Sequence, residues 1–317
     1  MDSLIFSMQS VLPLFLLILV GYLLRRSSVV SDSFVSAGTK IVFNIALPIT
    51  LFMQISSADL TSLFDIGLIG YVLGSSLLII AVLCIIVPRF IRNHASAGAF
   101  IQGMFRGNFA ILGVPLAINM FGAEEGAITS LLLPFTVPLY NIMAVVVLTV
   151  FSEDSQSSGK IPVKKILKGI ITNPLIIAIV IALPFSLLKI QMPVLVTKCL
   201  QPFNNLTTPL ALLCLGGQCT IQTVKDNLKL SVTAALLKEI FVSTLAILGG
   251  ILLGFRGGAL GAIFITFMAP SAVSSYIMAK NMKSDSDLAG QILIMTTILS
   301  CLTLFLGTYI LRELALI

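Results

Sequence analysis

Charged residues are scarce in this chain: they make up 10% of its 317 residues, whereas hydrophobic residues make up 57% and the mean hydropathy is +1.09. A soluble domain carries roughly 25% charged residues, because charge has to coat a water-facing surface. The scarcity therefore excludes a soluble globular protein. It also argues against a nucleic-acid partner, since the basic residues behind the net charge of +6 are spread over short loops. The composition predicts an integral membrane protein.

Residues that hold metals or perform catalysis are scarce as well. The one histidine, His94, lies in a basic loop, and the sequence shows no paired carboxylates and no nucleophile elbow. The five cysteines form no CxxC pair and lie in or beside apolar runs, as small buried residues do: Cys84, Cys199, Cys214, Cys219 and Cys301. We expect no metal, no cofactor and no enzyme activity.

Long apolar runs, by contrast, fill the sequence. A bilayer core of about 30 Å needs about 20 apolar residues per helix. This criterion predicts an all-α protein whose first span is a retained helix and not a signal peptide. Ten spans are expected, of which the second, fourth, seventh and ninth are interrupted by Pro, Gly, Asn or Ser: 4–24, 34–55, 64–87, 97–121, 126–151, 166–188, 195–219, 231–254, 258–281 and 288–311.

Lysine and arginine predict the orientation of these spans. Most of them lie in one set of alternate loops, and the other set, with the termini, holds only Lys189, Lys198, Arg256 and Arg312. Because cytoplasmic loops carry the excess of basic residues, both termini are expected outside, in a multi-pass protein of the cell membrane. The longest polar break, Ser152–Lys165, looks like a linker between two halves.

The two halves resemble each other. Asn44 and Asn205 are 161 positions apart, and so are Pro48 and Pro209, and Pro13 and Pro174. Each half would hold five spans, and an odd number makes the second half enter the membrane from the opposite side. The sequence predicts a first inverted repeat in residues 1–155, a cytoplasmic linker in 156–165 and a second repeat in 166–317. Inverted repeats are typical of secondary transporters.

Helix-breaking residues occupy equivalent places in the fourth and ninth spans. A broken helix at membrane depth survives only where protein buries it or water reaches it, because unsatisfied backbone groups are costly in hydrocarbon. By the repeat offset, Asn108 falls opposite Pro270, so the two breaks should cross near the midplane and leave positive helix ends that favour an anion. The alternative is that these residues merely pack and kink helices. The residues concerned are Gly107, Gly113 and Pro115, and Pro270, Ser271, Ser274 and Ser275.

Four ordered motifs resemble those of the auxin efflux carrier family, which includes bacterial malate and malonate permeases and plant PIN carriers. They are RGNFAILGVPLAINMFG (106–122), TNPLIIAIVIAL (172–183), TPLALLCLGGQ (208–218) and APSAVSSYIMAKNM (269–282). The resemblance implies a crossing of helices four and nine, as in bile-acid symporters and sodium/proton antiporters. It also implies a scaffold of helices 1, 2, 6 and 7 and a transport bundle of helices 3–5 and 8–10.

The resemblance also implies a site for a carboxylate at the crossing, at Asn108 and Pro270. This chain has Gly107 where plant carriers have proline, Ser271 where they have glutamine, and no long central loop. A carrier of small organic anions such as malate, working by alternating access, therefore fits better than an auxin carrier. The expected substrate-binding residues are Asn108, Gly107, Gly113, Pro115, Pro270, Ser271, Ser274, Ser275, Tyr276, Asn44 and Asn205.

Several alternatives stay open. A sodium-coupled symporter of the bile-acid type shares the architecture, and a passive anion channel is a further alternative. Direct cation exchange is disfavoured, because no Asp or Glu lies within the core of spans four or nine. The coupling ion could be a proton or sodium, or transport could be uncoupled, and a homodimer is also open. The sequence points to no nucleic-acid partner, only to a small organic anion and the lipid bilayer.

Five polar residues carry separate expectations. Arg106 either attracts the anionic substrate or extends to the cytoplasmic interface. Asn44 and Asn205 are expected to face the protein interior near the cavity, either as part of the site or as contacts between helices. Lys238 and Glu239 are expected to neutralise each other near the cytoplasmic end of the eighth span.

Overall fold

The computed structural model describes residues 16–57, 65–109, 131–152, 163–218 and 221–317, together with Gly113, Ala117, Ile128 and Thr129. Within this part of the chain, regular secondary structure is helical, apart from an isolated bridge in the middle of the molecule. Residues 16–26 are helical. The elements that follow are α2 (Asp32–Ile41), η1 (Val42–Ala46), α3 (Leu47–Ser56), α4 (Ile66–Phe90), α5 (His94–Phe105), α7 (Leu133–Val150), α9 (Val163–Ile171), α10 (Pro174–Leu187), α11 (Val194–Gln218), α12 (Ile221–Leu236), η3 (Leu237–Val242), α13 (Ser243–Leu252), α14 (Gly257–Met268), α15 (Val273–Asn281) and α16 (Ser286–Glu313).

Polar residues of the short loops determine where several helices begin. The side chains of Asp65, Asn93 and Asp285 each accept a hydrogen bond from a backbone N–H three residues further on, at 2.9–3.0 Å. Such caps satisfy N–H groups that have no partner within the helix. The scarce polar residues thus mark helix ends, and the apolar runs between them form the helices.

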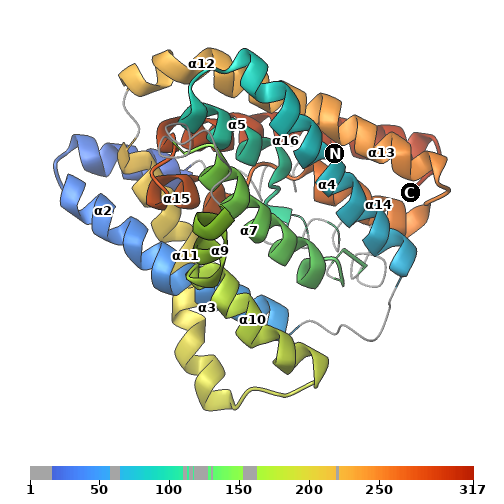
Figure 1. Cartoon of the computed structure of the whole chain (residues 1–317), viewed down its shortest axis with the longest axis horizontal. Coiled ribbons are helices and arrows are strands. Elements are labelled where there is room, and N and C mark those ends of the chain that lie inside the picture. The colour runs from blue at the N-terminus through green and yellow to red at the C-terminus, as the bar shows by residue number, and fades with distance from the viewer. Residues whose placement is uncertain are drawn as a thin grey trace.

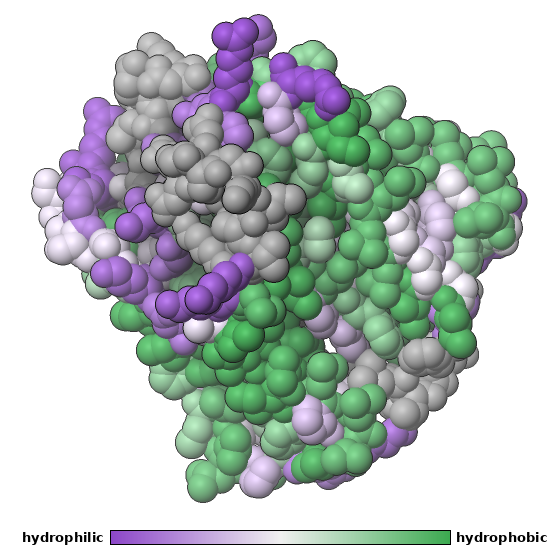
Figure 2. Space-filling view, in the orientation of Figure 1, coloured by the Kyte–Doolittle hydropathy of each residue, from purple (hydrophilic) through white to green (hydrophobic). Residues whose placement is uncertain are grey.

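Five helical stretches among the described residues are long and apolar enough to cross a membrane: Asp32–Met53, Ile66–Phe90, Leu133–Val150, Asn227–Leu252 and Ser286–Glu313. Pro174–Leu187 and Gly257–Met268 are shorter apolar helices. Many large apolar side chains on these helices are exposed, as lipid-facing surfaces require. Apolar residues cover most of the face in Figure 2, and hydrophilic residues gather mainly toward its top and left.

Several predicted spans correspond to observed helices where the structure describes them, but the sixth, 166–188, is divided between α9 and α10 at Thr172 and Asn173. The third, seventh and tenth predicted spans match α4, α11 and α16 to within three residues at either end. The first, 4–24, lies mostly outside the described residues. The fourth and ninth are the broken ones: α5 ends at Phe105, and a non-helical stretch of four residues separates α14 from α15. Both breaks fall where the sequence predicted them.

The second and seventh spans, expected to be interrupted, are not. The elements α2, η1 and α3 follow one another without a gap, with a π-helical turn at Val42–Ala46, and α11 is one helix of 25 residues despite Pro202 and Pro209. Packing supports them, since Thr50 of α3 and Thr207 of α11 share a buried hydrogen bond of 2.9 Å. A proline inside a helix is tolerated where neighbouring helices and hydroxyls support the backbone.

The two broken helices lie in the middle of the molecule. In Figure 1, α3 and α10 lie toward the bottom and α13 and α14 at the right, while α5 and α16 lie above α7 and α15 lies toward the left. The helix α3 packs against α10 and α11, and α14 packs against α13. One cluster of buried apolar residues runs through most of these helices. The breaks are therefore surrounded by protein, as irregular backbone in a membrane protein must be.

Candidate functional site

The backbones of the two breaks pair directly. Gly107 and Ser271 form an isolated antiparallel bridge. The N–H of Asn108 donates to the carbonyl of Pro270 at 2.7 Å, and the N–H of Ala272 donates to the carbonyl of Arg106 at 3.0 Å. Each break thus provides hydrogen-bond partners for backbone N–H and C=O groups that lack a helical partner in the other break. This pairing avoids the cost of unpaired backbone groups in an apolar setting.

Two further contacts hold this crossing in place. The hydroxyl of Ser271 donates to the carbonyl of Gly103 at 2.5 Å, and the N–H of Ser271 donates to the hydroxyl of Thr296 at 3.1 Å. A Cβ at Gly107 would lie 3.0 Å from the carbonyl oxygen of Thr266, so the absence of a side chain lets the two chains approach closely. The crossing is a fixed frame to which neighbouring side chains are attached.

A cavity of about 60 Å³ lies beside the crossing. Both breaks contribute to its wall, as do α3 and α7. Its polar lining includes Asn108, whose side chain hydrogen-bonds to no described residue, and Tyr140, Thr50 and Ser274. The remaining lining residues are Leu47, Leu51, Arg106, Gly107, Phe109, Val137, Asn141 and Ala272.

Arg106 is the one charged residue among the described residues of this lining. Its side chain is buried, with 3% of the residue exposed, and it donates to the side-chain oxygen of Asn141 at 2.7 Å and to the sulfur of Met278 at 2.6 Å. No carboxylate among the described residues pairs with it. The alternative in which Arg106 extends to the interface is wrong, because both of its contacts lie inside the protein.

The first turn of α15 adds to the positive character of the cavity. This helix begins at Val273 after Ala272 in extended conformation, and Ala272 and Ser274 both line the cavity. A helix N-terminus carries a partial positive charge and N–H groups without intrahelical partners. A buried arginine, a helix N-terminus and an amide thus converge on one small space. Such a set of groups is chemically suited to an anion.

Other predicted site residues support this cavity without lining it. Pro270 and Ser271 form the crossing, and Ser275 and Tyr276 are buried among the surrounding helices. Gly113 is a packing residue, since a Cβ there would lie 2.7 Å from a methyl group of Ile265. Pro115 lies outside the described residues. Of the predicted set, the described residues that line the cavity are Gly107, Asn108 and Ser274, together with Arg106.

The expectation for Asn44 and Asn205 is wrong. Both side chains are exposed at the surface of the described structure, and neither lines the cavity. Asn44 donates to the carbonyl of Lys40 at 2.9 Å, and Asn205 accepts from Gln201 at 2.8 Å. Each amide is satisfied by a residue four positions earlier in its own helical segment, so it needs no partner in the interior.

The cavity contains residues that the sequence analysis did not select. Tyr140 and Asn141 of α7 and Thr50 of α3 are the clearest. Asn141 could have been found, because it is an amide in the apolar run 126–151, and polar residues inside a membrane usually face the protein interior or a water-filled cavity. Thr50 has no such signal, since threonine is common in any membrane helix.

Lys238 and Glu239 also lie elsewhere than expected. They form an ion pair of 3.0 Å with side chains 3% and 0% exposed. The helical stretch that carries them runs from Asn227 to Leu252, so the pair lies at its middle and not near an end. Among the described residues, no group of three or more His, Cys, Asp or Glu side chains could hold a metal ion.

Comparison with known proteins identifies the family. The profile of a family described as membrane transport protein matches residues 6–307. An uncharacterized transporter of Methanocaldococcus jannaschii is 24% identical over 311 residues, which cover 96% of this chain and 98% of the relative. An uncharacterized transporter of Methanothermobacter thermautotrophicus is 23% identical over 321 residues, with the same coverage. The chain therefore belongs to the membrane transport protein family, that of the auxin efflux carriers, and is a multi-pass membrane transporter and not an enzyme.

Proposed function

We propose that the protein moves a small organic anion, a mono- or dicarboxylate such as malate, across the cell membrane by alternating access. The observation that carries this proposal is Arg106, a buried cation beside a cavity without a carboxylate partner among the described residues. A charge in the bilayer costs at least about 2.5 kcal/mol on insertion scales, and charges kept there mark substrate pathways. A substrate carboxylate would supply the missing partner.

The groups around the cavity would contact different parts of the substrate. The guanidinium of Arg106 donates to one carboxylate, oriented by its 2.7 Å bond to Asn141. The amide of Asn108 and the first turn of α15 donate to the same or a second carboxylate. The apolar wall of Leu47, Leu51 and Val137 packs against the carbon chain. The set favours anions over cations, because it combines the cation Arg106 with the positive end of α15 and includes no carboxylate among the described residues.

The proposed architecture has ten helices in two inverted five-helix repeats that cross at the fourth and ninth helices. Its support is the likeness of the two breaks: α5 and α14 each have 12 residues and each ends in extended backbone, and the two backbones pair antiparallel. Residues 156–165 would be the cytoplasmic linker between the repeats, and both termini would lie outside.

The mechanism follows from the position of the cavity. It is bounded by α3, a helix of the proposed scaffold, and by both breaks and α7, which belong to the proposed transport bundle. At about 60 Å³ it has room for a few water molecules but not for a dicarboxylate. Movement of the bundle against the scaffold would widen it toward one side of the membrane at a time. A membrane potential that is negative inside would drive an uncoupled anion outward.

Purified protein in liposomes tests the proposal. Vesicles loaded with unlabelled malate should accumulate labelled malate by exchange, and other mono- and dicarboxylates should compete, whereas organic cations should not. Saturable exchange also separates a carrier from a passive channel, and replacing external sodium by choline separates out a sodium-coupled symporter. Exchange of an organic cation, with no response to any carboxylate, would overturn the proposal.

A further inference from the structure

The buried ion pair of Lys238 and Glu239 has a place in the fold that the proposed anion site does not explain. It lies in the π-helical turn η3, in the middle of a stretch long enough to span the membrane. A buried ion pair contributes little net stability, because removing two charges from water costs about as much as their attraction returns. π-helical turns inside helices occur frequently at functional sites. We therefore expect the pair to have a role beyond packing.

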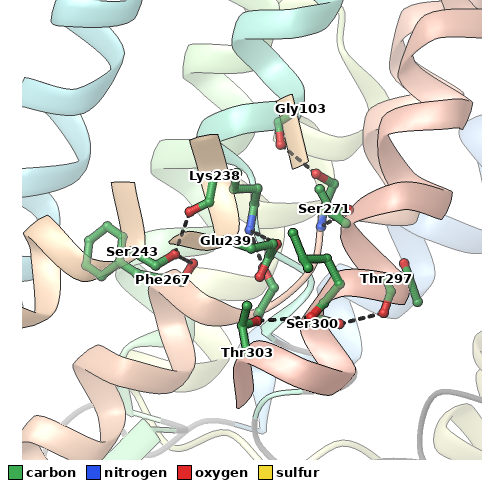
Figure 3. Close-up of polar contacts among 12 residues, drawn as sticks. Gly103, Lys238, Glu239, Ser243, Phe267, Ser271, Thr297, Ser300 and Thr303 are labelled. Atoms are coloured by element: carbon green, nitrogen blue, oxygen red, sulfur yellow. Dashed lines mark hydrogen bonds and ion pairs between the residues drawn. The ribbon is translucent and has the colours of Figure 1, made fainter. Parts of the chain in front are cut away.

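The pair is hydrogen-bonded to the crossing through Lys238. The ammonium of Lys238 donates to Glu239 at 3.0 Å and also to the carbonyl of Ala269, the residue at which α14 ends. Beside it, the hydroxyl of Ser243 donates to the carbonyl of Phe267 at 2.7 Å. In Figure 3, Lys238 and Glu239 lie next to Ser271, the residue that bridges to Gly107. A change in the charge of this pair would thus act on the broken ninth helix.

Lys238 and the proposed anion site lie beside two cavities that share Gly107 in their walls. Lys238 lines a second, smaller cavity together with Gly107 and Thr266. Gly107 also lines the cavity that holds Arg106 and Asn108. Gly107 therefore borders both the cavity beside Lys238 and the proposed substrate space. Charges in a protein interior act on each other more strongly than charges in water do.

Among the described residues, the surroundings of Glu239 contain a single charged partner. The elements packed against η3 are α5, α12, α13, α14 and α16, and the charged side chain that they and η3 place against Glu239, among the described residues, is Lys238. The titratable residues of α5 and α16 with described side chains lie within a turn or so of the helix ends: His94, Asp287, Tyr309, Arg312 and Glu313. From α16, the side chains of Thr297, Ser300 and Thr303 lie around the pair in Figure 3, with Thr303 beside the carboxylate.

We propose that Glu239 is the proton-binding site of a proton-coupled transport cycle and that Lys238 transmits its charge state to the crossing. This inference rests on the proposed function, since it names the ion that moves with the organic anion. A hydronium ion on one side gives its proton to the carboxylate, so that one O–H bond breaks in the solvent as one O–H bond forms at Glu239. The reverse exchange returns the proton to a water molecule on the other side.

The coupling is electrostatic. Protonation neutralises Glu239 and leaves the ammonium of Lys238 without its counter-charge, beside the crossing. The substrate anion in the neighbouring cavity then becomes the negative charge that balances Lys238, so proton and anion each favour the binding of the other. This reciprocity is a thermodynamic requirement of any such linkage. In the conformation described here Glu239 is fully buried, so protons would reach it only when the bundle has moved.

A pH gradient at zero voltage tests the inference in the same liposomes. With one proton per anion, each unit of pH difference should drive about a tenfold accumulation of labelled malate, because one pH unit corresponds to about 1.4 kcal/mol. Addition of malate should also move protons, visible with an internal pH dye. Glu239→Gln should lose this accumulation and the proton movement while still exchanging malate for malate at equal pH. Glu313→Gln, which changes an exposed carboxylate at the end of α16, is the matched control and should behave like the wild type.

The outcomes separate the two proposals. Wild-type protein that exchanges malate but neither accumulates it in a pH gradient nor moves protons overturns the inference alone. Glu239→Gln with unchanged accumulation also overturns it. Wild-type protein that exchanges no carboxylate overturns the proposed function. If Glu239→Gln fails to fold, the double variant Lys238→Met/Glu239→Gln decides, because it leaves no unpaired buried charge; accumulation in a pH gradient by this variant contradicts the inference.

Discussion

Replacement of Arg106 by glutamine tests whether the charge of this side chain serves substrate binding or the stability of the fold. The side chain is buried, pairs with no carboxylate among the described residues and contacts Asn141 and Met278. A buried charge without a counter-charge disfavours the folded state of a membrane helix, at about 2.5 kcal/mol or more. Glutamine can still donate to Asn141 and carries no charge. The variant should therefore fold at least as well as the wild type.

Substrate binding should weaken in this variant, although folding should not. A hydrogen bond to a charged group contributes about 1.5–3 kcal/mol, which corresponds to roughly a 10- to 100-fold rise in the KM for malate. The measurement is malate exchange over a range of external concentrations, together with thermal unfolding in detergent. Arg256→Gln is the matched control, because Arg256 is exposed and donates only to backbone carbonyls.

Two results would refute this reasoning. An unchanged KM and rate in Arg106→Gln would show that the guanidinium does not meet the substrate. A fall of several degrees in unfolding temperature, with the activity lost only in proportion to folded protein, would make Arg106 a structural residue held by Asn141 and Met278.

Three further predictions concern the crossing and its support. Asn108→Ala should lower malate exchange at least tenfold, since a donor to the carboxylate is lost, while Asn44→Ala, at an exposed amide, should leave it unchanged; equal effects in the two variants would contradict the assignment. Ser271→Ala leaves the carbonyl of Gly103 without its 2.5 Å bond and should cost about 1–3 kcal/mol, read as a lower unfolding temperature. Gly216→Ala should strongly reduce the yield of folded protein, because its Cβ would lie 1.9 Å from the carbonyl oxygen of Ile18, whereas Gly74→Ala meets nothing within 4 Å and should be tolerated.

The helical spans and their two breaks could be read from the sequence because they follow from local chemistry. Apolar runs of about 20 residues have one stable form in lipid, and capping residues such as Asp65 and Asn93 mark where they begin. Glycine and proline near Asn108 and Pro270 weaken the helix through their own backbones, whatever surrounds them. The repeat offset then paired these two positions, and their backbones are joined by a 2.7 Å hydrogen bond.

The direction in which each side chain faces was decided only by the tertiary structure. In a membrane helix both the lipid-facing and the protein-facing surface are apolar, so the periodicity that orients a soluble helix is weak. Asn44 and Asn205 match at the offset of 161 positions yet lie exposed, because each finds a hydrogen bond within its own helix. Arg106 and Asn141, 35 residues apart, meet only because α7 packs beside the break. Lys238 and Glu239 are adjacent in sequence, but their contact with Ala269 depends on how α13 and α14 pack, and packing depends on shape rather than on residue order.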